Sequence, residues 1–534
     1  MNYALNVPDH IAVFTDRTRH AFRAGETLSF DDVRVTLLLE DGACRISLSA
    51  DDTPLRFLYL RWTMPLPEKA LFLGDAWERT YGDSQWRTHD PSRCMPWYFL
   101  MQHENMTAGF GVKVRPGAFA MWNADRDGVT LWLDLRCGSR GVLLKGRTLE
   151  VATVVSAEYG DCNAFAAARR FCTVMCGDPL KPEKPVYGGN NWYYAYGRSS
   201  HEAILDDSRY LASLCEGLSN RPYMVIDDGW QVLRNVQPGN SGPWDGGNSL
   251  FPDMERLAAE MRGCGVRPGL WFRPLWNQNP SIPREWLLPA PGENREATYL
   301  DPSIPEVLEF VQNDIRRFVS WGFELIKHDF TTYDIFGKYA FDARPWLASG
   351  KWSFHDTGRT SAEVVKSLYT AILEAAGDAL ILGCNTIGHL GAGLMHLSRI
   401  GDDTSGISWE RTRKMGINTL AFRLCQHRTF FDVDADCLGV TGKIPWAQNR
   451  QWAELLAQSG TPFLASIKPG IFSASEFEEV KRYFSLASRQ EVVAEPLDWM
   501  ENTIPQKWSF NGREREFRWS MCDDSGSDPD FAVF

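Results

Sequence analysis

The sequence predicts a chain of three parts: an N-terminal β-sandwich, a central (β/α)8 barrel and a small C-terminal β domain. Residues 1 to about 180 are short runs of alternating apolar and polar residues separated by turn residues, which is typical of a sandwich. From Val186 onward, strand-like and helix-like stretches alternate, as in parallel βα units. Several of these strand-like runs end in a carboxylate, and a barrel brings all its strand ends together at one face.

The N-terminal part, residues 1–180, contains strand-like runs such as residues 33–39, 128–135 and 148–155. Turn residues separate these runs at regular spacing, as they do in antiparallel sheets. A helical stretch at residues 164–176 follows. The proline-rich segment 177–185 then predicts a boundary between domains.

The central part, residues 186–475, predicts the barrel. Its strand candidates are residues 186–194, 223–230, 267–274, 323–330, 380–385, 397–403, 429–436 and 462–466. Helical stretches between them are residues 201–217, 304–320, 361–376, 409–424 and 447–459. Eight parallel strands joined in this way predict a closed barrel. The last part, residues 476–534, predicts one more helix and a small β-rich domain.

Composition and charge favour a globular enzyme with a neutral substrate. Hydrophobic residues make up 44% of the 534 residues and charged residues 23%, which is ordinary for such an enzyme. The formal net charge of -12 disfavours nucleic acids and anionic membranes as partners, because both require a basic face. The 21 tryptophans and 16 tyrosines offer flat faces on which sugar rings stack, although most large aromatic side chains fill cores.

The 12 cysteines lack the paired spacing of zinc sites, so we expect reduced thiols, no structural metal and a cytoplasmic location. The N-terminal residues contain no signal-peptide pattern. No stretch approaches 18 consecutive apolar residues, so we expect no membrane span.

The fourth strand candidate supplies the first candidate catalytic acid. It ends Lys327-His328-Asp329, and alternation along a strand places Lys327 and Asp329 on the same side. If this side faces the barrel interior, the ammonium group lies beside the carboxylate and favours the ionised form that a nucleophile requires. The alternative is a structural ion pair followed by a turn.

The sixth strand candidate supplies Arg399, Asp402 and Asp403. The backbones of two strands that are two positions apart in a barrel, such as the fourth and the sixth, are separated by roughly 10 Å. Inward-leaning side chains reduce this distance to the ~5–5.5 Å that separates the two carboxyl groups of retaining glycosidases. One of the two acids would face inward as the general acid/base, and its neighbour would shape the loop or bind a hydroxyl group. The alternative is a plain turn, which Asp, Ser and Gly also favour.

Three further strand ends carry groups suited to a sugar. The second strand candidate ends in Asp227-Asp228 beside a tryptophan, and two carboxylates can accept hydrogen bonds from a diol. Trp192 and Trp271, near the ends of the first and third strand candidates, offer faces for stacking. Together these residues predict a carbohydrate site at the carboxyl ends of the strands.

Short motifs follow one another in a defined order along the chain. They are DDGW at residues 227–230, GLWF at 269–272, IKHD at 326–329, RIGDD at 399–403, FDVDADCL at 431–438 and SGTPF at 459–463. This order resembles the clan of retaining α-galactosidases, glycoside hydrolase families 27 and 36, over roughly residues 187–470. The β-rich N-terminal part is similar to family 36, whose sandwich leans a tryptophan-bearing loop into the active site. Residues 75–83 are the candidate loop here.

The resemblance implies a mechanism without a cofactor, in which Asp329 is the nucleophile and Asp402 the general acid/base of a double displacement with retention. Asp227 and Asp228 would bind hydroxyl groups of a galactose-like ring. The implied substrate is an oligosaccharide or glycoside with a terminal α-galactosyl residue. The other candidate substrate-binding residues are Lys327, Arg399, Asp403, Trp271, Trp192, Cys384 and Asn385, of which the last two occupy the position where the clan reads the 2-substituent.

Two positions depart from family 36. Cys384 is followed by Asn385, where that family has a glycine-rich stretch, and the third strand candidate ends in Arg273, where the family has Glu-Pro-Glu. These departures concern the identity of the sugar more than the mechanism.

Three alternatives accompany this hypothesis. A transferase similar to raffinose synthases would pass the same covalent intermediate to a sugar hydroxyl group. A metal-dependent barrel enzyme would use four acids as Mg²⁺ ligands, namely Asp227, Asp228, Asp329 and Asp402. A sugar-binding protein would lack catalysis altogether. The resemblance also allows a homo-oligomer.

Overall fold

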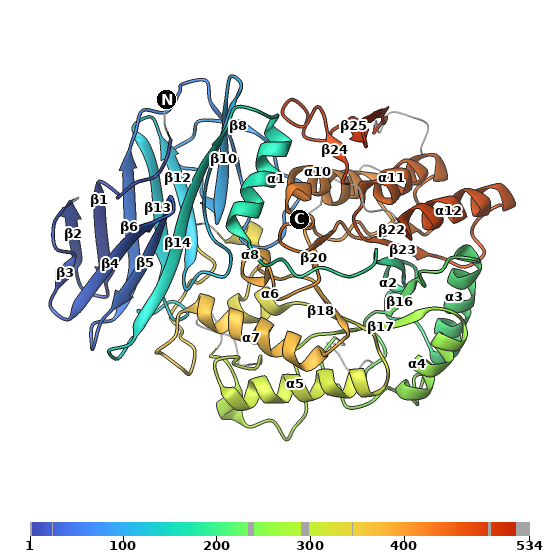
Figure 1. Ribbon diagram of the computed structural model, residues 1–534. Coiled ribbons are helices and arrows are strands. Elements are labelled where there is room, and N and C mark those ends of the chain that lie inside the picture. The colour runs from blue at the N-terminus through green and yellow to red at the C-terminus, as the bar shows by residue number, and fades with distance from the viewer. Residues whose placement is uncertain are drawn as a thin grey trace.

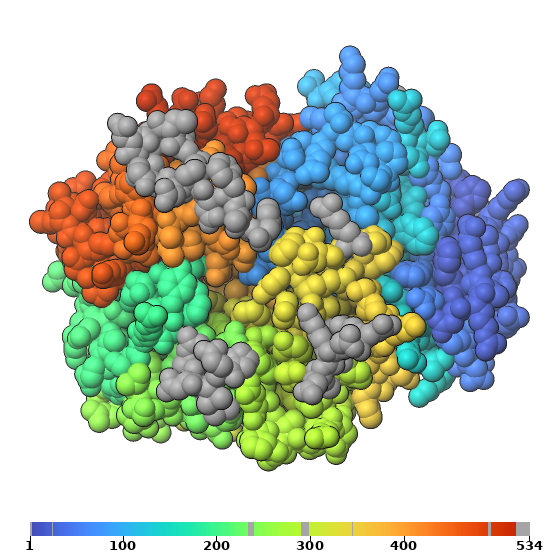
Figure 2. All heavy atoms as spheres, turned by 180° about the vertical axis from the view of Figure 1, so that it is seen from behind, coloured from blue at the N-terminus to red at the C-terminus, as the bar shows by residue number. Residues whose placement is uncertain are grey.

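The computed structural model describes residues 3–23, 25–232, 240–289, 298–343, 345–489 and 493–519. Figure 1 shows the N-terminal β-sheets at one end of the molecule and the barrel with its helices at the other. Figure 2, from behind, shows the blue N-terminal domain packed against barrel segments coloured yellow. The predicted fold class, a sandwich, a barrel-like parallel sheet and a small C-terminal sheet, is confirmed. Residues 520–534 of the predicted C-terminal domain lie outside the described residues.

Two antiparallel sheets form the N-terminal sandwich. Their strand orders are β2-β1-β6-β13-β12-β9 and β3-β4-β5-β14-β11-β10-β7-β8. The strands are β1 His10–Thr15, β2 Arg19–Arg23, β3 Ser29–Phe30, β4 Val33–Glu40, β5 Ala43–Ser49, β6 Leu55–Thr63, β7 Leu71–Gly74, β8 Arg87–Thr88, β9 Met95–Pro96, β10 Tyr98–His103, β11 Met106–Val112, β12 Phe119–Asp125, β13 Gly128–Asp134 and β14 Thr148–Tyr159.

Alternation along these strands builds the sandwich core. In β5, Cys44, Ile46 and Leu48 are buried, whereas the residues between them are partly or fully exposed. Helix α1, Ala164–Met175, then covers β11. The close approach requires Gly109, because a Cβ atom there would lie 2.5 Å from the ring of Phe171.

Nine short parallel strands form the barrel sheet, in the order β21-β20-β19-β18-β17-β16-β15-β23-β22. They are β15 Tyr187–Asn190, β16 Tyr223–Ile226, β17 Arg267–Phe272, β18 Leu325–His328, β19 Leu380–Gly383, β20 Leu397–Arg399, β21 Asp432–Asp434, β22 Leu438–Val440 and β23 Phe463–Ile467. Residues 435–437 alone join the edge strands β21 and β22, so the two edges of the sheet meet.

Each of the eight predicted barrel strands overlaps an observed strand, with β21 in the place of the seventh, whereas β22 at residues 438–440 was not predicted. Seven of the predicted strands extend two to four residues too far at their carboxyl ends. The physical reason is common to all seven: the residues that follow the ladder turn out of the sheet and shape the loops at this face of the barrel.

Helices surround the barrel sheet. They are α2 Trp192–Ala195, α3 His201–Leu214, α4 Met254–Gly263, α5 Pro305–Ser320, α6 Thr331–Phe336, α7 Ser361–Ala376, α8 Gly388–Gly391 and α11 Trp446–Ser459, with 3-10 turns η1 Arg284–Trp286, η2 Ala340–Asp342 and η4 Leu424–Gln426. A capping box formed by Thr360 and Glu363 begins α7 at the predicted residue.

The single helix predicted for residues 409–424 is wrong. This stretch divides into α9 Trp409–Arg411, a π-helical segment η3 Thr412–Asn418 and α10 Thr419–Arg423. The Oγ1 atom of Thr419 donates to the carbonyl groups of Met415 and Gly416. At the junction of η3 and α10, these two carbonyl groups therefore accept from a side chain.

The C-terminal part contains the predicted helix and β-rich element. Helix α12, Ala474–Ala487, precedes strands β24 Glu495–Pro496, β25 Lys507–Phe510 and β26 Arg513–Glu516, which pair antiparallel. The 11 cysteines in the part of the chain that the structure describes are free thiols. No helix within the described ranges has both the length and the apolar character that a membrane span requires.

Three buried histidines predict a steep loss of stability in acid. Burial lowers the pKa of His328, His389 and His427 from 6.5 to about 3. The unfolded chain therefore binds more protons than the folded chain between pH 6.5 and pH 3, so stability falls as the pH falls through this window. Each histidine contributes a slope of up to about 1.4 kcal/mol per pH unit.

We expect His328→Leu to flatten the pH dependence of the free energy of unfolding between pH 6.5 and pH 4.5. Both ring nitrogens of His328 are buried without a hydrogen-bond partner, so the substitution removes the titration and breaks no described hydrogen bond. Urea unfolding at four pH values measures the slope, with the exposed His10→Leu as the control. A slope equal to that of the wild type would contradict the assignment to His328.

Candidate active site

A pocket lies at the carboxyl ends of the barrel strands, where the sequence predicts the site. Its lining residues are Asn190, Trp192, Tyr193, Asp227, Asp228, Asn240, Trp271, Lys327, Asp329, Phe330, Asp403, Asp436 and Cys437. Seven of the eleven predicted site residues are among them. The four that do not line the pocket are Arg399, Asp402, Cys384 and Asn385.

Asp329 follows the last residue of β18 and faces the pocket. The indole N–H of Trp271 donates to its Oδ2 atom at 3.1 Å, and the backbone N–H of Phe330 donates to its Oδ1 atom at 2.7 Å. Phe330 adopts a left-handed conformation with φ of 63°, which turns the chain away from the strand directly after the acid. Both carboxylate oxygens are therefore held in place by neighbouring donors.

The sequence had predicted that the ammonium group of Lys327 lies beside Asp329. In the structure, Lys327 is hydrogen-bonded to Asp227. Its Nζ atom lies 2.7 Å from Oδ2 of Asp227, which also accepts from the side chain of Asn190 at 2.8 Å. Burial acts to lower the pKa of Lys327, but the carboxylate of Asp227 outweighs it and the pKa lies above its ordinary value. Lys327 is therefore an ammonium donor at the floor of the pocket.

Asp228, the neighbour of Asp227, is also buried and lines the pocket. The side chain of Gln231 donates to its Oδ1 atom at 2.7 Å. Its own N–H donates to Oδ1 of Asp227 at 2.9 Å, which fixes the two acids relative to each other. Trp230 is fully buried and donates to the carbonyl of Trp271, so it supports the wall from behind.

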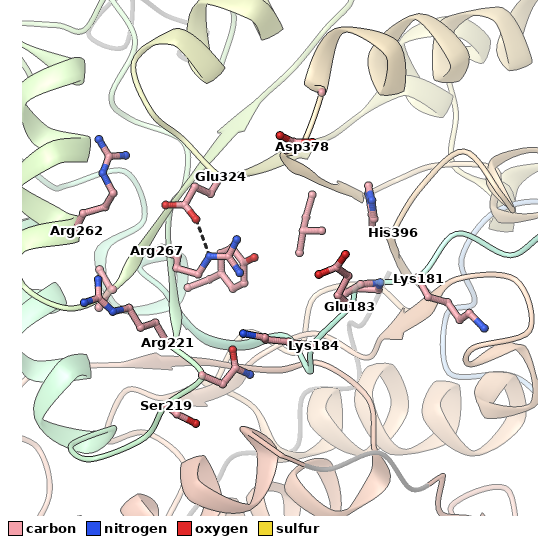
Figure 3. A pocket seen from close by; sticks show the side chains of 16 residues that line it. Lys181, Glu183, Lys184, Ser219, Arg221, Arg262, Arg267, Glu324, Asp378 and His396 are labelled. Atoms are coloured by element: carbon pink, nitrogen blue, oxygen red, sulfur yellow. Dashed lines mark hydrogen bonds and ion pairs between the residues drawn. The ribbon is translucent and has the colours of Figure 1, made fainter.

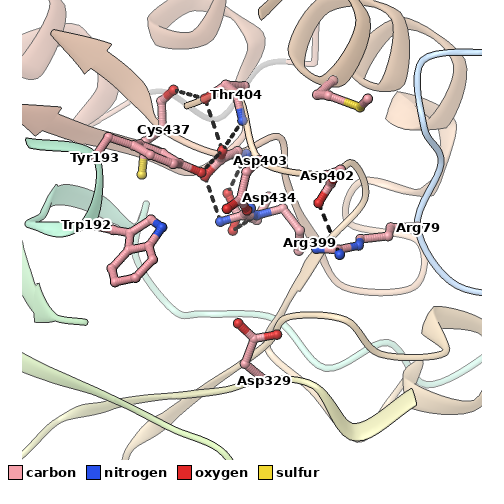
Figure 4. A network of polar contacts seen from close by, with 12 residues as sticks. Arg79, Trp192, Tyr193, Asp329, Arg399, Asp402, Asp403, Thr404, Asp434 and Cys437 are labelled. Carbon is pink, nitrogen blue, oxygen red and sulfur yellow. Dashed lines mark hydrogen bonds and ion pairs between the residues drawn. The ribbon is translucent and has the colours of Figure 1, made fainter. Parts of the chain in front are cut away.

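Arg399, the last residue of β20, lies behind the pocket among three carboxylates (Figure 4). Its guanidinium group lies 3.2 Å from Asp403, 3.1 Å from Asp434 and 2.7 Å from Asp436. Three acids around one cation leave a local excess of negative charge. Such a group favours uptake of a proton by at least one member.

Two of these acids differ in their affinity for protons. Burial acts to raise the pKa of Asp403, but Arg399 and Arg79 outweigh it, so the pKa lies below its ordinary value. The pKa of Asp436 is raised, first by burial and then by the charges of the neighbouring acids. Asp436 also accepts hydrogen bonds from Tyr193 and from Thr404.

Asp402, the predicted general acid/base, lies beside the pocket instead of in its lining. Its Oδ1 atom lies 3.1 Å from a guanidinium nitrogen of Arg79, and its Oδ2 atom accepts from Arg411 at 2.9 Å. Figure 4 shows Asp402 next to Arg79, to one side of the acids around Arg399. Both carboxylate oxygens of Asp402 are therefore engaged by cations.

Cys384 and Asn385, the predicted readers of the 2-substituent, have other partners. Cys384 is buried in an apolar cluster with Tyr193 and Cys437. The side-chain oxygen of Asn385 accepts from the N–H of Tyr333 at 3.0 Å, and its side-chain nitrogen donates to Glu78. The amide group of Asn385 thus holds loops together behind the pocket.

Comparisons with known proteins give matches of fold. No protein-family model and no curated protein matches the sequence. An α-galactosidase from Thermus thermophilus, solved with p-nitrophenyl α-D-galactopyranoside, has a TM-score of 0.60 and 18% identity, over 90% of this chain and 98% of that chain. A family 36 α-galactosidase from Geobacillus stearothermophilus has a TM-score of 0.62 and 14% identity, over 94% of this chain and 79% of that chain.

This chain has the fold of the family 36 α-galactosidases. A third match, the α-galactosidase from Lactobacillus brevis, has a TM-score of 0.58 and 13% identity, over 90% of this chain and 69% of that chain. Other structures of the Geobacillus stearothermophilus protein are complexes with raffinose and with stachyose. At these identities the comparisons establish the α-galactosidase fold.

Within this α-galactosidase fold, six lining residues were absent from the predicted site. Tyr193 follows the predicted Trp192, Phe330 follows the predicted Asp329, and Asn190 lies two residues before Trp192, so a search of the sequence close to the predicted residues would have included all three. Asp436 and Cys437 follow β21, in a motif that the sequence had matched without assigning roles. Asn240 lies in a loop after β16 and carries no sequence signal.

Arg273, where the chain departs from the family motif, supports the candidate pocket from outside. Its guanidinium group is buried, pairs with Asp334 and lies 4.2 Å from the ring centroid of Phe330. It also donates to the side chain of Asn240 at 3.0 Å. Arg273 therefore contacts two lining residues without reaching the pocket itself.

A larger cavity of about 810 Å³ lies at the opposite end of the barrel (Figure 3). Tyr223, Arg267 and Leu380, which line it, are the first residues of β16, β17 and β19. Many of its charged side chains, including Lys184 and Arg221, are exposed. Enzymes with this barrel carry their chemistry at the carboxyl ends of the strands, so the smaller pocket is the candidate active site.

Proposed function

We propose that this protein is a retaining glycoside hydrolase that cleaves terminal α-galactosyl residues, with Asp329 as nucleophile and Asp403 as general acid/base. The observation that carries the proposal is one pocket in which these two carboxylates meet the Asp227–Lys327 pair and two tryptophans. We assign the acid/base role to Asp403 instead of Asp402 because Asp403 lines the pocket and Asp402 does not.

In the first step, Asp329 attacks the anomeric carbon and forms a covalent glycosyl-enzyme through an oxocarbenium-like transition state. The donors from Trp271 and Phe330 orient the carboxylate so that its remaining lone pairs are available to the sugar. The same donors stabilise the carboxylate when it becomes the leaving group in the second step.

Asp403 would protonate the glycosidic oxygen in the first step and deprotonate water in the second. Its pKa lies low in the free protein, so substrate must help to protonate it. A sugar in the pocket removes water from Asp403, which favours the neutral carboxyl group. The pKa of Asp436 is raised, so Asp436 takes up a proton before Asp403 does.

The remaining lining residues would recognise the sugar. Asp227 and Asp228 accept hydrogen bonds from hydroxyl groups, and Lys327 donates to them. Trp192 and Trp271 offer faces to the apolar side of the ring. Four of these side chains lie in or directly after barrel strands, and Trp192 begins helix α2, so the pocket is organised before a sugar binds.

The competing hypotheses receive less support from the geometry. As metal ligands, Asp227 and Asp402 would each have to leave a cation that already pairs with it: Lys327 for Asp227 and Arg79 for Asp402. Within the described ranges, no group of three or more His, Cys, Asp or Glu side chains is arranged to hold a metal ion. Transfer to a sugar would use the same intermediate as hydrolysis, and product analysis at high acceptor concentration separates the two.

A panel of p-nitrophenyl glycosides tests the proposal. We expect the α-galactoside to be cleaved at least about 100-fold faster, in kcat/KM, than the α-glucoside, because an inverted hydroxyl group would leave buried acids without a partner. The N-acetyl-α-galactosaminide and the β-L-arabinopyranoside define the tolerance at the 2- and 6-positions. Equal rates with the galactoside and the glucoside, or no cleavage by the folded protein, would contradict the proposal.

A further inference from the structure

The loop between β7 and β8 carries residues of the N-terminal domain to the end of strand β20. The N–H of Thr80 donates to the carbonyl of Ile400 at 2.8 Å, and Thr80 forms a β-bridge with Gly401. Trp77, the tryptophan of this loop, is buried against aromatic residues of the interface and does not line the pocket. The loop therefore contacts the segment that carries Asp402 and Asp403.

The path of this loop is fixed by contacts with the barrel. Arg423 donates to the carbonyl of Glu78 at 2.6 Å and pairs with Asp75 at 3.2 Å. Gly82, with φ of 73°, passes so close to Lys414 that a Cβ atom would lie 2.4 Å from its side chain. The side chains of the loop thus have little freedom to move relative to the barrel.

Arg79 is the residue of this loop that approaches the catalytic segment. Its side chain is only 8% exposed and lies over the rings of Tyr81 and Tyr339, at 5.6 Å and 5.5 Å from their centroids. Tyr339 belongs to the barrel, so the guanidinium group is held between the two domains. From there it reaches Oδ1 of Asp402 at 3.1 Å.

Asp402 and Asp403 lie three and four residues after Arg399, the end of β20, and of the two only Asp403 lines the pocket. The sheet ends at Arg399, so strand alternation does not decide which of the two does. Arg79 and Arg411 bind one oxygen each of Asp402 on the outer side. Asp403, the next residue, lies among the lining residues.

We propose that Arg79 is a positioning residue of the active site that acts across the domain interface: by holding Asp402 outside the pocket, it keeps Asp403 facing Asp329. This inference rests on the proposed function. It assigns the N-terminal domain a role in catalysis through a residue that does not touch the substrate.

The charged and titratable groups that face Asp403 determine its pKa. The cations are Arg399 on β20, Lys327 on β18, Arg411 on α9 and Arg79 on the loop, and the other facing groups are Asp436, Tyr193 and Tyr196. Asp402 is the next residue in the chain, and Asp434 pairs with the same Arg399. Arg79 is one of the cations that lower the pKa of Asp403. Loss of its charge must therefore raise the pKa of Asp403.

The test compares Arg79→Met, Arg79→Lys and a matched control, Arg136→Met. Arg136 has 7% side-chain exposure, lies over the ring of Phe57 and donates across the same interface to the carbonyl of Ala348. It therefore shares the burial and interface position of Arg79 but has no contact with the catalytic segment. Steady-state kinetics on p-nitrophenyl α-D-galactopyranoside as a function of pH provide the readout.

We expect Arg79→Met to lower kcat on the order of 100-fold, with KM within threefold of the wild type. Its alkaline limb of kcat/KM should move to higher pH, since an acid with a higher pKa stays protonated longer. Arg79→Lys should keep the limb near that of the wild type. Arg136→Met should lower the stability of the fold but leave kcat and the alkaline limb as in the wild type. If Arg79→Met has the kcat and pH limb of Arg136→Met, the inference is overturned, whereas an inactive wild type would overturn the proposed function itself.

Discussion

Asp329→Ala is expected to lower kcat on an aryl α-galactoside by at least about 10⁴-fold, because it removes the nucleophile of a double displacement. The fold should persist, since Asp329 is only half-buried and lines the pocket instead of the core. Stopped assays of p-nitrophenol release measure the loss. Asp342→Ala, an exposed acid in the loop after β18, is the control and should keep wild-type activity.

Added azide tests whether the activity lost in Asp329→Ala is that of a nucleophile. The cavity left by Asp329→Ala admits a small anion to the side of the anomeric carbon from which the carboxylate attacks. We expect azide to restore part of the release of p-nitrophenol and to form a galactosyl azide of inverted configuration. Activity of Asp329→Ala within tenfold of the wild type, without azide, would remove Asp329 as the nucleophile.

Asp403→Asn is expected to lower kcat on an oligosaccharide by about 10³-fold, and Asp402→Asn by no more than about 100-fold. Asp403 lines the pocket, whereas Asp402 pairs with Arg79 and Arg411 beside it. An aryl substrate distinguishes acid catalysis from positioning, because p-nitrophenolate departs without a proton. Asp403→Asn should therefore retain a faster first step with the aryl substrate than with raffinose.

The comparison between the two substrates decides the assignment. A general acid shows a large difference between raffinose and the aryl galactoside when it is replaced, and a positioning residue shows a similar loss with both. If Asp402→Asn shows the large difference and Asp403→Asn does not, the acid/base role returns to Asp402, as the sequence had predicted.

Much of the fold follows from local sequence pattern. The strand before Asp329 begins with apolar residues directly after Gly322-Phe323-Glu324, and the ladder of β18 lies within the predicted range. Helix α7 begins and ends where its cap and apolar period predict. The carboxyl ends of the strands were extended too far, because the residues there, such as Asp227, Asp329 and Asp403, belong to the loops and the pocket and not to the sheet.

The site was less predictable where a side chain depends on contacts from distant parts of the chain. Asn385 was predicted to face the sugar, but its φ of 53° and its bonds to Tyr333 and Glu78 turn the amide elsewhere. Asp402 and Asp403 are chemically equivalent in the sequence. What separates them in the structure is the pair of cations that hold Asp402, namely Arg411 and Arg79, the latter more than 300 residues earlier in the chain.

The most direct test of the central claim is the configuration of the first sugar released by the wild-type protein. Proton NMR during cleavage of p-nitrophenyl α-D-galactopyranoside resolves the α and β anomers of galactose before they interconvert. A double displacement by Asp329 and Asp403 predicts that α-galactose accumulates first. β-Galactose as the first product would show a single displacement and contradict the roles assigned to both carboxylates.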